Sequence, residues 1–270
     1  MSAKILDGKK IADNILESIA AVRAESNIIP RLAILSIGTD SASDVYIKNK
    51  MSACKRCGFV CEVVCLPDFD KTEVNRIIGE WEGGGNVDGI IVQLPVPGLT
   101  DENRHCLHVS RQKDVDGFLS DNPKHKPCTP KGIMRMLDEV VLGHGIAGLN
   151  AVVIGRSEIV GKPMAQMLLE ADCTVTVCHS HTQNLAMHTK NADILIVAAG
   201  KPGLITADMV KPGAIVIDVG INRVNGKLIG DVDFDAVKEV AGWITPVPGG
   251  VGPMTVAMLM DNVLSAAQYC

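Results

Sequence analysis

The stretch "AVVIGRSEIVGKPMAQMLL" (residues 151–169) decides the fold, because it reads as a buried strand, a glycine-bearing turn and a helix in direct succession. This order points backbone N–H groups and a helix N-terminus at the place where a dinucleotide pyrophosphate binds. Gly155 and Gly161 fit the usual three-glycine fingerprint, but Ser157 stands near its middle glycine, so the motif alone is weak. The context is stronger, since the stretch opens a series of five strand-like segments: "NAVVIG", "CTVTVCH", "ADILIVAAG", "AIVIDVG" and "GWIT". The second half of the chain therefore predicts a doubly wound, Rossmann-like domain.

The first half of the chain contains another alternation of strands and helices. The strand-like runs "RLAILSIG", "FVCEVVC" and "VDGIIVQLP" are separated by helical segments at Ser41–Cys57 and 72–81. The last run is apolar without alternation, as in a parallel sheet covered on both faces. An amphipathic helix over 7–27, with Asp7 as its N-cap, precedes them. The sequence thus predicts two α/β domains with a cleft between them.

Turn and cap signals mark the junctions. Pro and Gly gather near residues 117–128 and predict a linker, after which Thr129 as N-cap and Pro130 start a new helix. The run "RVNGKLIG" predicts a hairpin turned by Asn225 and Gly226. Residues 253–268 predict a C-terminal helix.

Composition excludes several classes of function. The chain has 270 residues and a formal net charge of −5, which argues against non-specific nucleic-acid binding and a basic membrane-binding patch. Its longest apolar runs have strand length, and the N-terminus lacks the apolar core of a secretion signal. Nine cysteines are spread through strand-like and helix-like segments, so reduced thiols and a cytoplasmic location are expected.

Four residues of the first domain are candidates for catalysis. Tyr46 and Lys50 are four residues apart on a predicted helix and share one face. Gln93 ends a strand, where it could orient the lysine, and Asp116 in "KDVDGF" could accept hydrogen bonds from an amidine-like heterocycle edge. An amine partly desolvated beneath an aromatic ring gives up its proton more easily. Each residue also has a plainer reading: a helix-surface charge, a strand-end polar group or a turn former.

The end of the second strand of the Rossmann-like domain favours NADP over NAD. An NAD enzyme commonly has an acid there, to accept from the ribose 2′-hydroxyl. This chain has His179, Ser180 and His181, and Arg156 stands in the glycine-bearing turn. Ser180 and Arg156 would accommodate a 2′-phosphate, although a solvated surface charge is the plainer reading of Arg156.

The order of the motifs resembles the bifunctional methylenetetrahydrofolate dehydrogenase/methenyltetrahydrofolate cyclohydrolase family. The matching stretches cover nearly the whole chain: "PRLAILSIGTDSASDVYIKNK", "VDGIIVQLPVP", "KDVDGF", "PCTPKGI", "VVIGRSEIVGKP", "KPGAIVIDVGIN" and "TPVPGGVGPMTVAML". The resemblance implies a catalytic, folate-binding domain (1–120 plus 253–270), closed by the C-terminal helix, and an NADP-binding domain (121–252). It also implies a homodimer.

The resemblance further implies roles for individual residues. Lys50 matches the catalytic lysine, Tyr46 the tyrosine that stacks on the substrate, Gln93 the support of the lysine, and Asp116 the aspartate that grips the pterin. The remaining substrate-binding positions are Leu94, Pro95, Gly249, Gly250 and Pro253. The cofactor-binding positions are Gly155, Arg156, Ser157, Val160, Gly161, Pro163, His179, Ser180, Ala199, Gly200, Gly220, Ile221 and Thr255.

The implied chemistry has two steps. Hydride transfer from 5,10-methylenetetrahydrofolate to NADP⁺ gives the methenyl cation and needs mainly positioning. Hydrolysis to 10-formyltetrahydrofolate needs proton movements, which a lysine can supply. One departure from the family pattern is the short segment "LSDNPKHK" (119–126), which puts the balance of the two activities in question.

Three alternatives remain at this point. The chain could retain only the dehydrogenase, or be a two-domain NAD(P)-dependent dehydrogenase of shikimate or amino-acid type. It could also be a non-catalytic nucleotide-sensing or scaffold protein. "VQLPVP" and Tyr46 argue against the second, and intact Lys50, Gln93 and Asp116 against the third.

No metal site is predicted. The cysteines of "CKRCGFVCEVVC" (residues 54–65) have a spacing that invites a zinc or iron–sulfur interpretation, but they fall on a helix end and a buried strand, where cysteine is a common core residue. His105 and His108 have no matching ligand pattern and are interpreted as surface residues.

Overall fold

The computed structural model describes residues 2–38, 41–99, 107, 109–119, 124–141 and 144–268. The chain forms two compact units, each built from separate stretches: Met1–Ala12 with Thr129–Thr255, and Asp13–Cys128 with Val256–Cys270. We call the first the six-stranded unit and the second the three-stranded unit, after their parallel sheets. This division differs from the predicted bounds at residues 1–12, 121–128 and 253–255. The strand β1 (Lys4–Ile5) belongs with the six-stranded sheet because it pairs with one of its strands.

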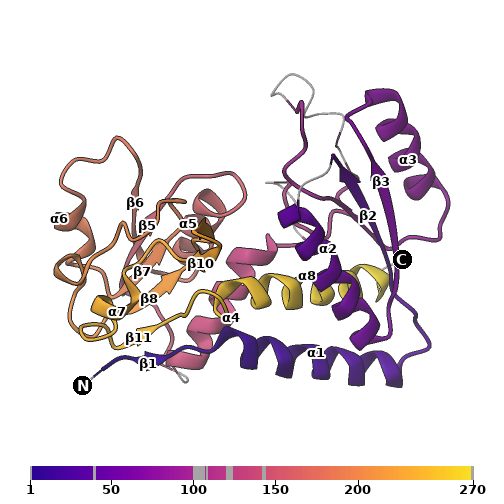
Figure 1. Ribbon diagram of the computed structural model, residues 1–270. Helices are drawn as coiled ribbons and strands as arrows, with labels where there is room; N and C mark the ends of the chain where they lie inside the picture. Colours follow the sequence, from indigo (N-terminus) through magenta and orange to yellow (C-terminus); the bar gives the residue numbers. More distant parts are fainter. Residues whose placement is uncertain are drawn as a thin grey trace. The chain divides into compact units, whose positions relative to one another are not determined.

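The three-stranded unit has a parallel sheet in the order β3-β2-β4, of which β2 and β3 are labelled in Figure 1. Its strands are β2 (Arg31–Ile37), β3 (Val60–Leu66) and β4 (Gly89–Val92). The connecting helices are α2 (Ser41–Cys57) and α3 (Lys71–Gly83), and Asp70 caps α3 by accepting from the N–H groups of Thr72 and Glu73. The crossover through α2 runs from β2 to β3, and the crossover through α3 runs back from β3 past β2 to β4. Because the two run in opposite directions, right-handed crossovers place α2 and α3 on opposite faces of the sheet. Alternate residues of β2 pack with the apolar face of α3: Ala33, Leu35 and Ile37 against Val74, Ile77, Ile78 and Trp81.

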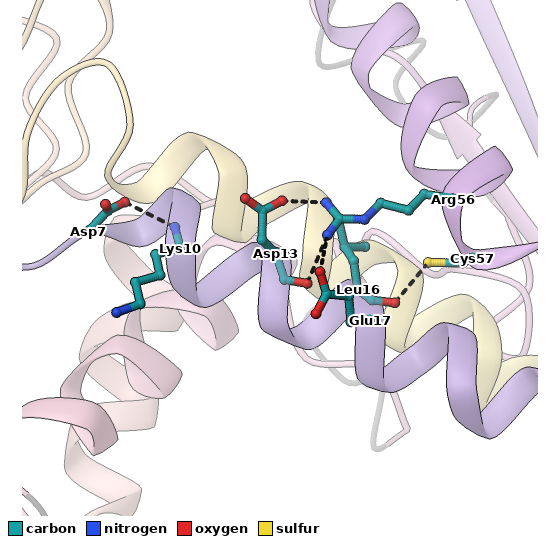
Figure 2. Close-up of polar contacts among 7 residues, drawn as sticks. All are labelled: Asp7, Lys10, Asp13, Leu16, Glu17, Arg56 and Cys57. Carbon is teal, nitrogen blue, oxygen red and sulfur yellow. Dashed lines mark hydrogen bonds and ion pairs between the residues drawn. The ribbon is translucent and has the colours of Figure 1, made fainter.

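Two long helices each have residues in both units. The helix α1 (Gly8–Glu25) begins where predicted, since the carboxylate of Asp7 accepts from the backbone N–H of Lys10 (Figure 2). The C-terminal helix α8 (Val251–Gln268) begins two residues before its predicted start. None of the helices within the described ranges is both long and apolar enough to cross a membrane.

The six-stranded unit has the doubly wound order β1-β11-β8-β7-β5-β6, and all its strand pairs are parallel. Beside β1 its strands are β5 (Asn150–Ile154), β6 (Thr174–Cys178), β7 (Ile194–Val197), β8 (Ile215–Asp218) and β11 (Trp243–Ile244). Its helices are α4 (Cys128–Val141), α5 (Gly161–Glu170), α6 (Leu185–Thr189) and α7 (Phe234–Val237), with a 3₁₀ turn at Ala207–Met209. The sheet interior is buried and aliphatic, for example at Val152, Leu195, Val197 and Val216. The chain leaves β5 toward β6 on one side and returns to β7 on the other, so β5 is the switch point where such sheets bind ligands.

Of two local predictions, the hairpin at residues 222–229 is confirmed and the N-cap at Thr129 is wrong. The hairpin of β9 (Asn222–Val224) and β10 (Lys227–Ile229) is confirmed, and Asn225 and Gly226 turn it with positive φ angles of 49° and 78°. The predicted N-cap at Thr129 is wrong, because α4 already begins at Cys128. The Thr129 hydroxyl instead hydrogen-bonds the hydroxyl of Thr255 at 2.9 Å.

Candidate active and nucleotide-binding sites

A buried lysine–glutamine pair lies at the carboxyl end of the three-stranded sheet. Lys50 on α2 is only 7% exposed, and its Nζ donates to Gln93 Oε1 at 3.0 Å. Gln93 directly follows β4, where its backbone N–H donates to Leu35 O at 2.8 Å. Its side-chain Nε2 donates to Leu94 O at 2.8 Å, which turns the amide oxygen toward the lysine. Within the described ranges the ammonium has no second hydrogen-bond partner, so it keeps donors for a substrate or water.

Asp116 lies within the electrostatic reach of this lysine. Burial raises the pKa of the Asp116 carboxyl, the positive charge of Lys50 opposes that shift, and the negative charge of Asp114 adds to it. The structure therefore brings together three of the four predicted residues, Lys50, Gln93 and Asp116. Their arrangement offers a donor, an amide and a carboxylate to a polar heterocycle.

Sequence reasoning missed Asp114, which shapes the loop that carries Asp116. The buried Asp114 carboxylate accepts from the backbone N–H groups of Gly117 at 3.1 Å and Leu119 at 2.9 Å. Gly117 has φ +72°, and a Cβ there would lie 2.6 Å from the backbone carbon of Lys126. The available signal was the Asp-x-Asp-Gly pattern of "KDVDGF", since aspartate side chains commonly close such turns.

A second missed residue, Asn262 on α8, secures the same loop. Its fully buried Nδ2 donates to Val115 O at 2.8 Å and to Lys126 O at 3.1 Å. These bonds fix both sides of the short segment 119–126, of which residues 120–123 lie outside the described ranges. The C-terminal helix thus takes part in building the site of this unit.

Tyr46 lies one turn before Lys50 on α2 and is half-buried. Burial raises the pKa of its phenol. Residues four apart share a helix face, so the ring is on the side of α2 that carries the buried lysine. Lys48, by contrast, is exposed.

The other predicted substrate residues fall in two places. Leu94 and the exposed Pro95 follow Gln93 and are joined by a cis peptide bond. Gly249, Gly250 and Pro253 lie in the six-stranded unit. Gly249 has φ +105°, and a Cβ on Gly250 would lie 2.6 Å from Pro246 O, so both glycines allow a tight turn before α8.

The turn between β5 and α5 has the geometry expected of a pyrophosphate site. Gly155 has φ +121°, and a Cβ there would lie 2.2 Å from Ala198 O. A Cβ on Gly161 would lie 2.2 Å from Gly155 O, so the turn closes only with glycine at both positions. The Ser157 hydroxyl accepts from the N–H groups of Val160 at 3.2 Å and Gly161 at 3.3 Å. A serine side chain here shapes the turn where the usual fingerprint has a glycine.

The groups predicted to bind a 2′-phosphate are accessible. Arg156 and Ser180 are exposed, in the turn after β5 and in the loop after β6. The His179 N–H donates to Thr182 Oγ1 at 2.9 Å, and His179 Nδ1 accepts from the His181 N–H at 3.2 Å. No carboxylate follows β6 within this loop, so the residues present fit a nucleotide that carries a phosphate there.

The loops after β7 and β8 carry four more of the predicted cofactor positions. Ala199, Gly200 and Ile221 are exposed, and Gly220 is buried. Pro163 is half-buried in the first turn of α5, and Thr255 lies in α8. These loops follow neighbouring strands of the sheet, β7 and β8 (Figure 1). Sequence reasoning missed the two aspartates that hydrogen-bond the backbone of these loops, Asp218 and Asp231.

Two of the four cysteines of residues 54–65 are buried, whereas Cys65 is exposed, and the interpretation of β3 as a buried strand is wrong because none of its residues is fully buried. Cys54 and Cys57 are buried on α2, where their thiols contact Met260 Sδ at 3.6 Å and Leu16 O at 3.8 Å. Burial raises the pKa of Cys57 to about 11. Cys61 on β3 is half-buried, and a hydrogen bond from Cys54 lowers its pKa. Among the residues that the structure describes, no three His, Cys, Asp or Glu side chains gather as metal ligands. His105 and His108 lie outside those residues.

Comparison with known proteins gives one consistent match. Residues 6–116 match the catalytic-domain model of tetrahydrofolate dehydrogenase/cyclohydrolase, and residues 127–270 match the NAD(P)-binding-domain model of the same family. The bifunctional protein FolD of Nitrosospira multiformis is 52% identical over 281 residues, covering 99% of this chain and 97% of that protein.

Solved structures agree with this match. The FolD methylenetetrahydrofolate dehydrogenase/cyclohydrolase of Campylobacter jejuni superposes with a TM-score of 0.93 at 41% identity, covering 99% of both chains. The Trypanosoma brucei enzyme, solved with NADP cofactor and an inhibitor, has a TM-score of 0.91 at 34% identity and covers 100% of this chain and 98% of that one. The chain therefore belongs to the bifunctional tetrahydrofolate dehydrogenase/cyclohydrolase family, with methylenetetrahydrofolate dehydrogenase and methenyltetrahydrofolate cyclohydrolase activities.

Proposed function

We propose that Lys50 moves the protons of the hydrolytic step, while Gln93, Tyr46 and Asp116 position the lysine and the folate. The observation that carries this proposal is the buried hydrogen bond of 3.0 Å between Lys50 Nζ and Gln93 Oε1. A neutral amide partner fixes the ammonium without neutralising it, and the remaining N–H groups can serve a substrate. Asp116, near the positive charge of Lys50, suits the donor edge of a pterin.

The two steps make different demands on these residues. Removal of a hydride from the bridging methylene carbon involves no proton, so the protein contributes mainly orientation. Attack of water on the methenyl cation releases a proton, and ring opening requires one at the departing nitrogen. Lys50 is placed for this acid–base work, and a positioned group of this kind typically contributes about 10²–10⁴-fold. Leu94 and Pro95, which follow Gln93, are further proposed folate-binding residues, and Gly249, Gly250 and Pro253 are proposed as such from the family resemblance.

The test replaces Lys50 by methionine, which keeps the length of the side chain and removes the amine. We expect K50M to lose cyclohydrolase activity by about 10²-fold or more and to keep dehydrogenase activity within about tenfold. The matched control is K48M, two residues away on the exposed side of α2, which should change neither step. Undiminished hydrolysis of the methenyl compound in K50M would overturn the assignment.

We further propose that NADP, rather than NAD, is the nucleotide of the NAD(P)-binding domain. NADP⁺ accepts the hydride when bound; Arg156 and Ser180 would hold its 2′-phosphate, and the other predicted cofactor positions would hold the rest of the nucleotide. The support is the exposed Arg156 and the absence of a carboxylate after β6 within the described loop. The test is R156A: KM for NADP⁺ should rise about tenfold or more, while KM for NAD⁺ stays unchanged. Equal effects on both nucleotides would argue against the 2′-phosphate contact.

We also propose that the chain forms a homodimer, which rests on its resemblance to the family. Light scattering of the purified protein should give about twice the chain mass of 28.7 kDa. A single-chain mass at all concentrations would contradict it.

A further inference from the structure

Two buried aspartates lie directly behind the loops proposed to bind the nucleotide. Asp218 ends β8 and is 3% exposed, while Asp231 follows β10 and is fully buried. Neither residue was singled out by the sequence motifs, and neither forms an ion pair among the described residues. Buried carboxylates without a cationic partner are costly, so their contacts require an explanation.

Asp231 hydrogen-bonds the loop after β7. One carboxylate oxygen accepts from the backbone N–H groups of Ala199 at 2.7 Å and Gly200 at 2.8 Å. The other oxygen accepts from Asn222 Nδ2 at 2.8 Å. The two loop residues are exposed, so their N–H groups are fixed from beneath while their outer surface stays open.

Asp218 in turn fixes Asp231. Its carboxylate accepts from the backbone N–H groups of Asp231 at 3.0 Å and Val232 at 2.9 Å, and from Gly220 at 2.9 Å. The Asp218 N–H donates to the buried hydroxyl of Thr245 at 2.8 Å, which ties this group to the residue after β11. Hydrogen bonds therefore link the end of β8 through Asp218 to Asp231, and through Asp231 to the loop after β7.

The two carboxylates are packed closely against the backbone of neighbouring glycines. A Cβ on Gly220 would lie 2.3 Å from the carboxyl carbon of Asp231, and a Cβ on Gly230 would lie 1.8 Å from an Asp218 oxygen. Each carboxylate thus fits against a backbone position that only glycine can occupy. Burial also raises the pKa of Asp218 to about 6, against the opposing effect of its three backbone N–H donors.

From this arrangement we propose that Asp231 is a positioning residue for the dehydrogenase step: it holds the backbone of Ala199 and Gly200 in the conformation that binds the nucleotide. The inference rests on the proposed function in that these two residues are taken as nucleotide contacts. Asp231 does not itself meet the nucleotide. Two neighbouring N–H donors bound to one charged oxygen are held more firmly than by a neutral acceptor, because charge-assisted bonds are roughly twice as strong.

The principal test is D231A, with both activities assayed on the full chain. We expect KM for NADP⁺ to rise about 10–100-fold, while KM for the folate and the cyclohydrolase rate change less than about twofold, since the hydrolytic step needs no hydride acceptor. The matched control is D235A, an exposed aspartate of the same segment, which should leave KM for NADP⁺ unchanged. A uniform loss of both activities, or an unchanged KM for NADP⁺, would overturn the proposal.

A second variant keeps the test decisive if D231A fails to fold. In D231N an amide replaces the charge, and its NH₂ group faces either the loop or the Asn222 amide. Either the two loop N–H groups or the Asn222 donor then lose their acceptor. We expect D231N to raise KM for NADP⁺ about 3–10-fold, an intermediate effect. Amide hydrogen exchange at residues 199 and 200 should speed up in D231N relative to the unchanged protein. A wild-type KM and unchanged exchange in D231N would overturn the proposal.

A third variant separates failure of this inference from failure of the proposed nucleotide site. A199W adds a large ring to the exposed face of the loop and leaves Asp231 untouched. If A199W raises KM for NADP⁺ and D231A does not, the positioning role of Asp231 is wrong. If neither variant raises it, the loop does not contact the nucleotide, and the assignment of Ala199 and Gly200 fails first.

Discussion

The three-stranded unit holds its buried ammonium in a different way from the two buried aspartates of the six-stranded unit. In the three-stranded unit a single ammonium, Lys50, is held by one side chain, Gln93. In the six-stranded unit two carboxylates, Asp218 and Asp231, are held by backbone N–H groups from three loops. A charge bound to a side chain can be altered without moving the main chain, whereas a charge bound to the backbone is part of the loop structure.

This difference separates the expected effects of mutation. Changes at Lys50 should alter the chemistry of one step and leave the fold intact. Changes around Asp218 should first alter the stability and shape of the loops, and through them nucleotide binding. The experiments below examine where that distinction holds.

The largest effect should come from Gly230→Ala. The added Cβ would lie 1.8 Å from an Asp218 oxygen that cannot move without losing backbone hydrogen bonds. We expect a loss of about 3–5 kcal/mol in the free energy of unfolding, measured by urea denaturation. Gly226→Ala is the control: the hairpin glycine has a positive φ but open space around it, so its replacement should cost about 1 kcal/mol. Similar losses in the two variants would mean that Asp218 is not rigidly held.

The next largest effect is a pH dependence of the free energy of unfolding that comes from Asp218. The pKa of about 6 in the folded chain lies above the value of about 3.9 expected after unfolding. Between these values the folded state binds a proton that the unfolded state does not, so this group favours folding most at low pH. Its contribution is lost as pH rises through about 6, and the full difference is about 3 kcal/mol.

The measurement compares the unchanged protein with D218N across that range. Urea denaturation from about pH 4 to pH 7 should show the unfolding free energy of the unchanged protein falling relative to that of D218N. Parallel curves for the two proteins would show that Asp218 does not titrate in this range.

A smaller effect should follow from Gln93→Leu, which tests whether the Gln93 side chain holds the Lys50 ammonium. The leucine removes the acceptor of the buried Lys50 ammonium, at a cost of about 1–3 kcal/mol in stability. Cyclohydrolase activity should fall about 10-fold or more, because the amine is no longer oriented. Q93E, which retains an acceptor, should be closer to the unchanged protein in stability. If Q93L hydrolyses the methenyl compound at the full rate, the orienting role of Gln93 is wrong.

Sequence patterns predicted the elements that rest on local rules. The helix Ser41–Cys57 has the predicted bounds, and the Asn225–Gly226 hairpin follows from backbone preferences alone. The pairing of Lys50 with Gln93 was expected because the helix that carries Lys50 follows one strand of a parallel sheet and Gln93 ends another, so both lie at the carboxyl ends of the strands. In such cases the positions in the sequence already imply the positions in space.

Apart from Asp114, the features that were missed depend on distant partners. The strand β1 has only two residues and exists because β11, more than two hundred positions later, offers its edge. Asp231 bonds N–H groups more than thirty residues earlier, and Asn262 bonds a loop that is distant in the sequence. A single aspartate or asparagine carries no periodicity or spacing that announces such contacts, so only the folded chain reveals them.

The smallest expected effect lies at the surface between α1 and α2, where Arg56 pairs with Asp13 and with Glu17 (Figure 2). These side chains are substantially exposed, and exposed pairs contribute little because water screens them. Arg56→Ala should lower the free energy of unfolding by less than about 1 kcal/mol, and added salt should reduce the difference. The neighbouring Cys57 is buried and donates to Leu16 O, so Cys57→Ala should cost more than Arg56→Ala despite removing no ion pair. The reverse order in denaturation measurements would mean that these surface charges, like the buried ones, help to hold the unit together.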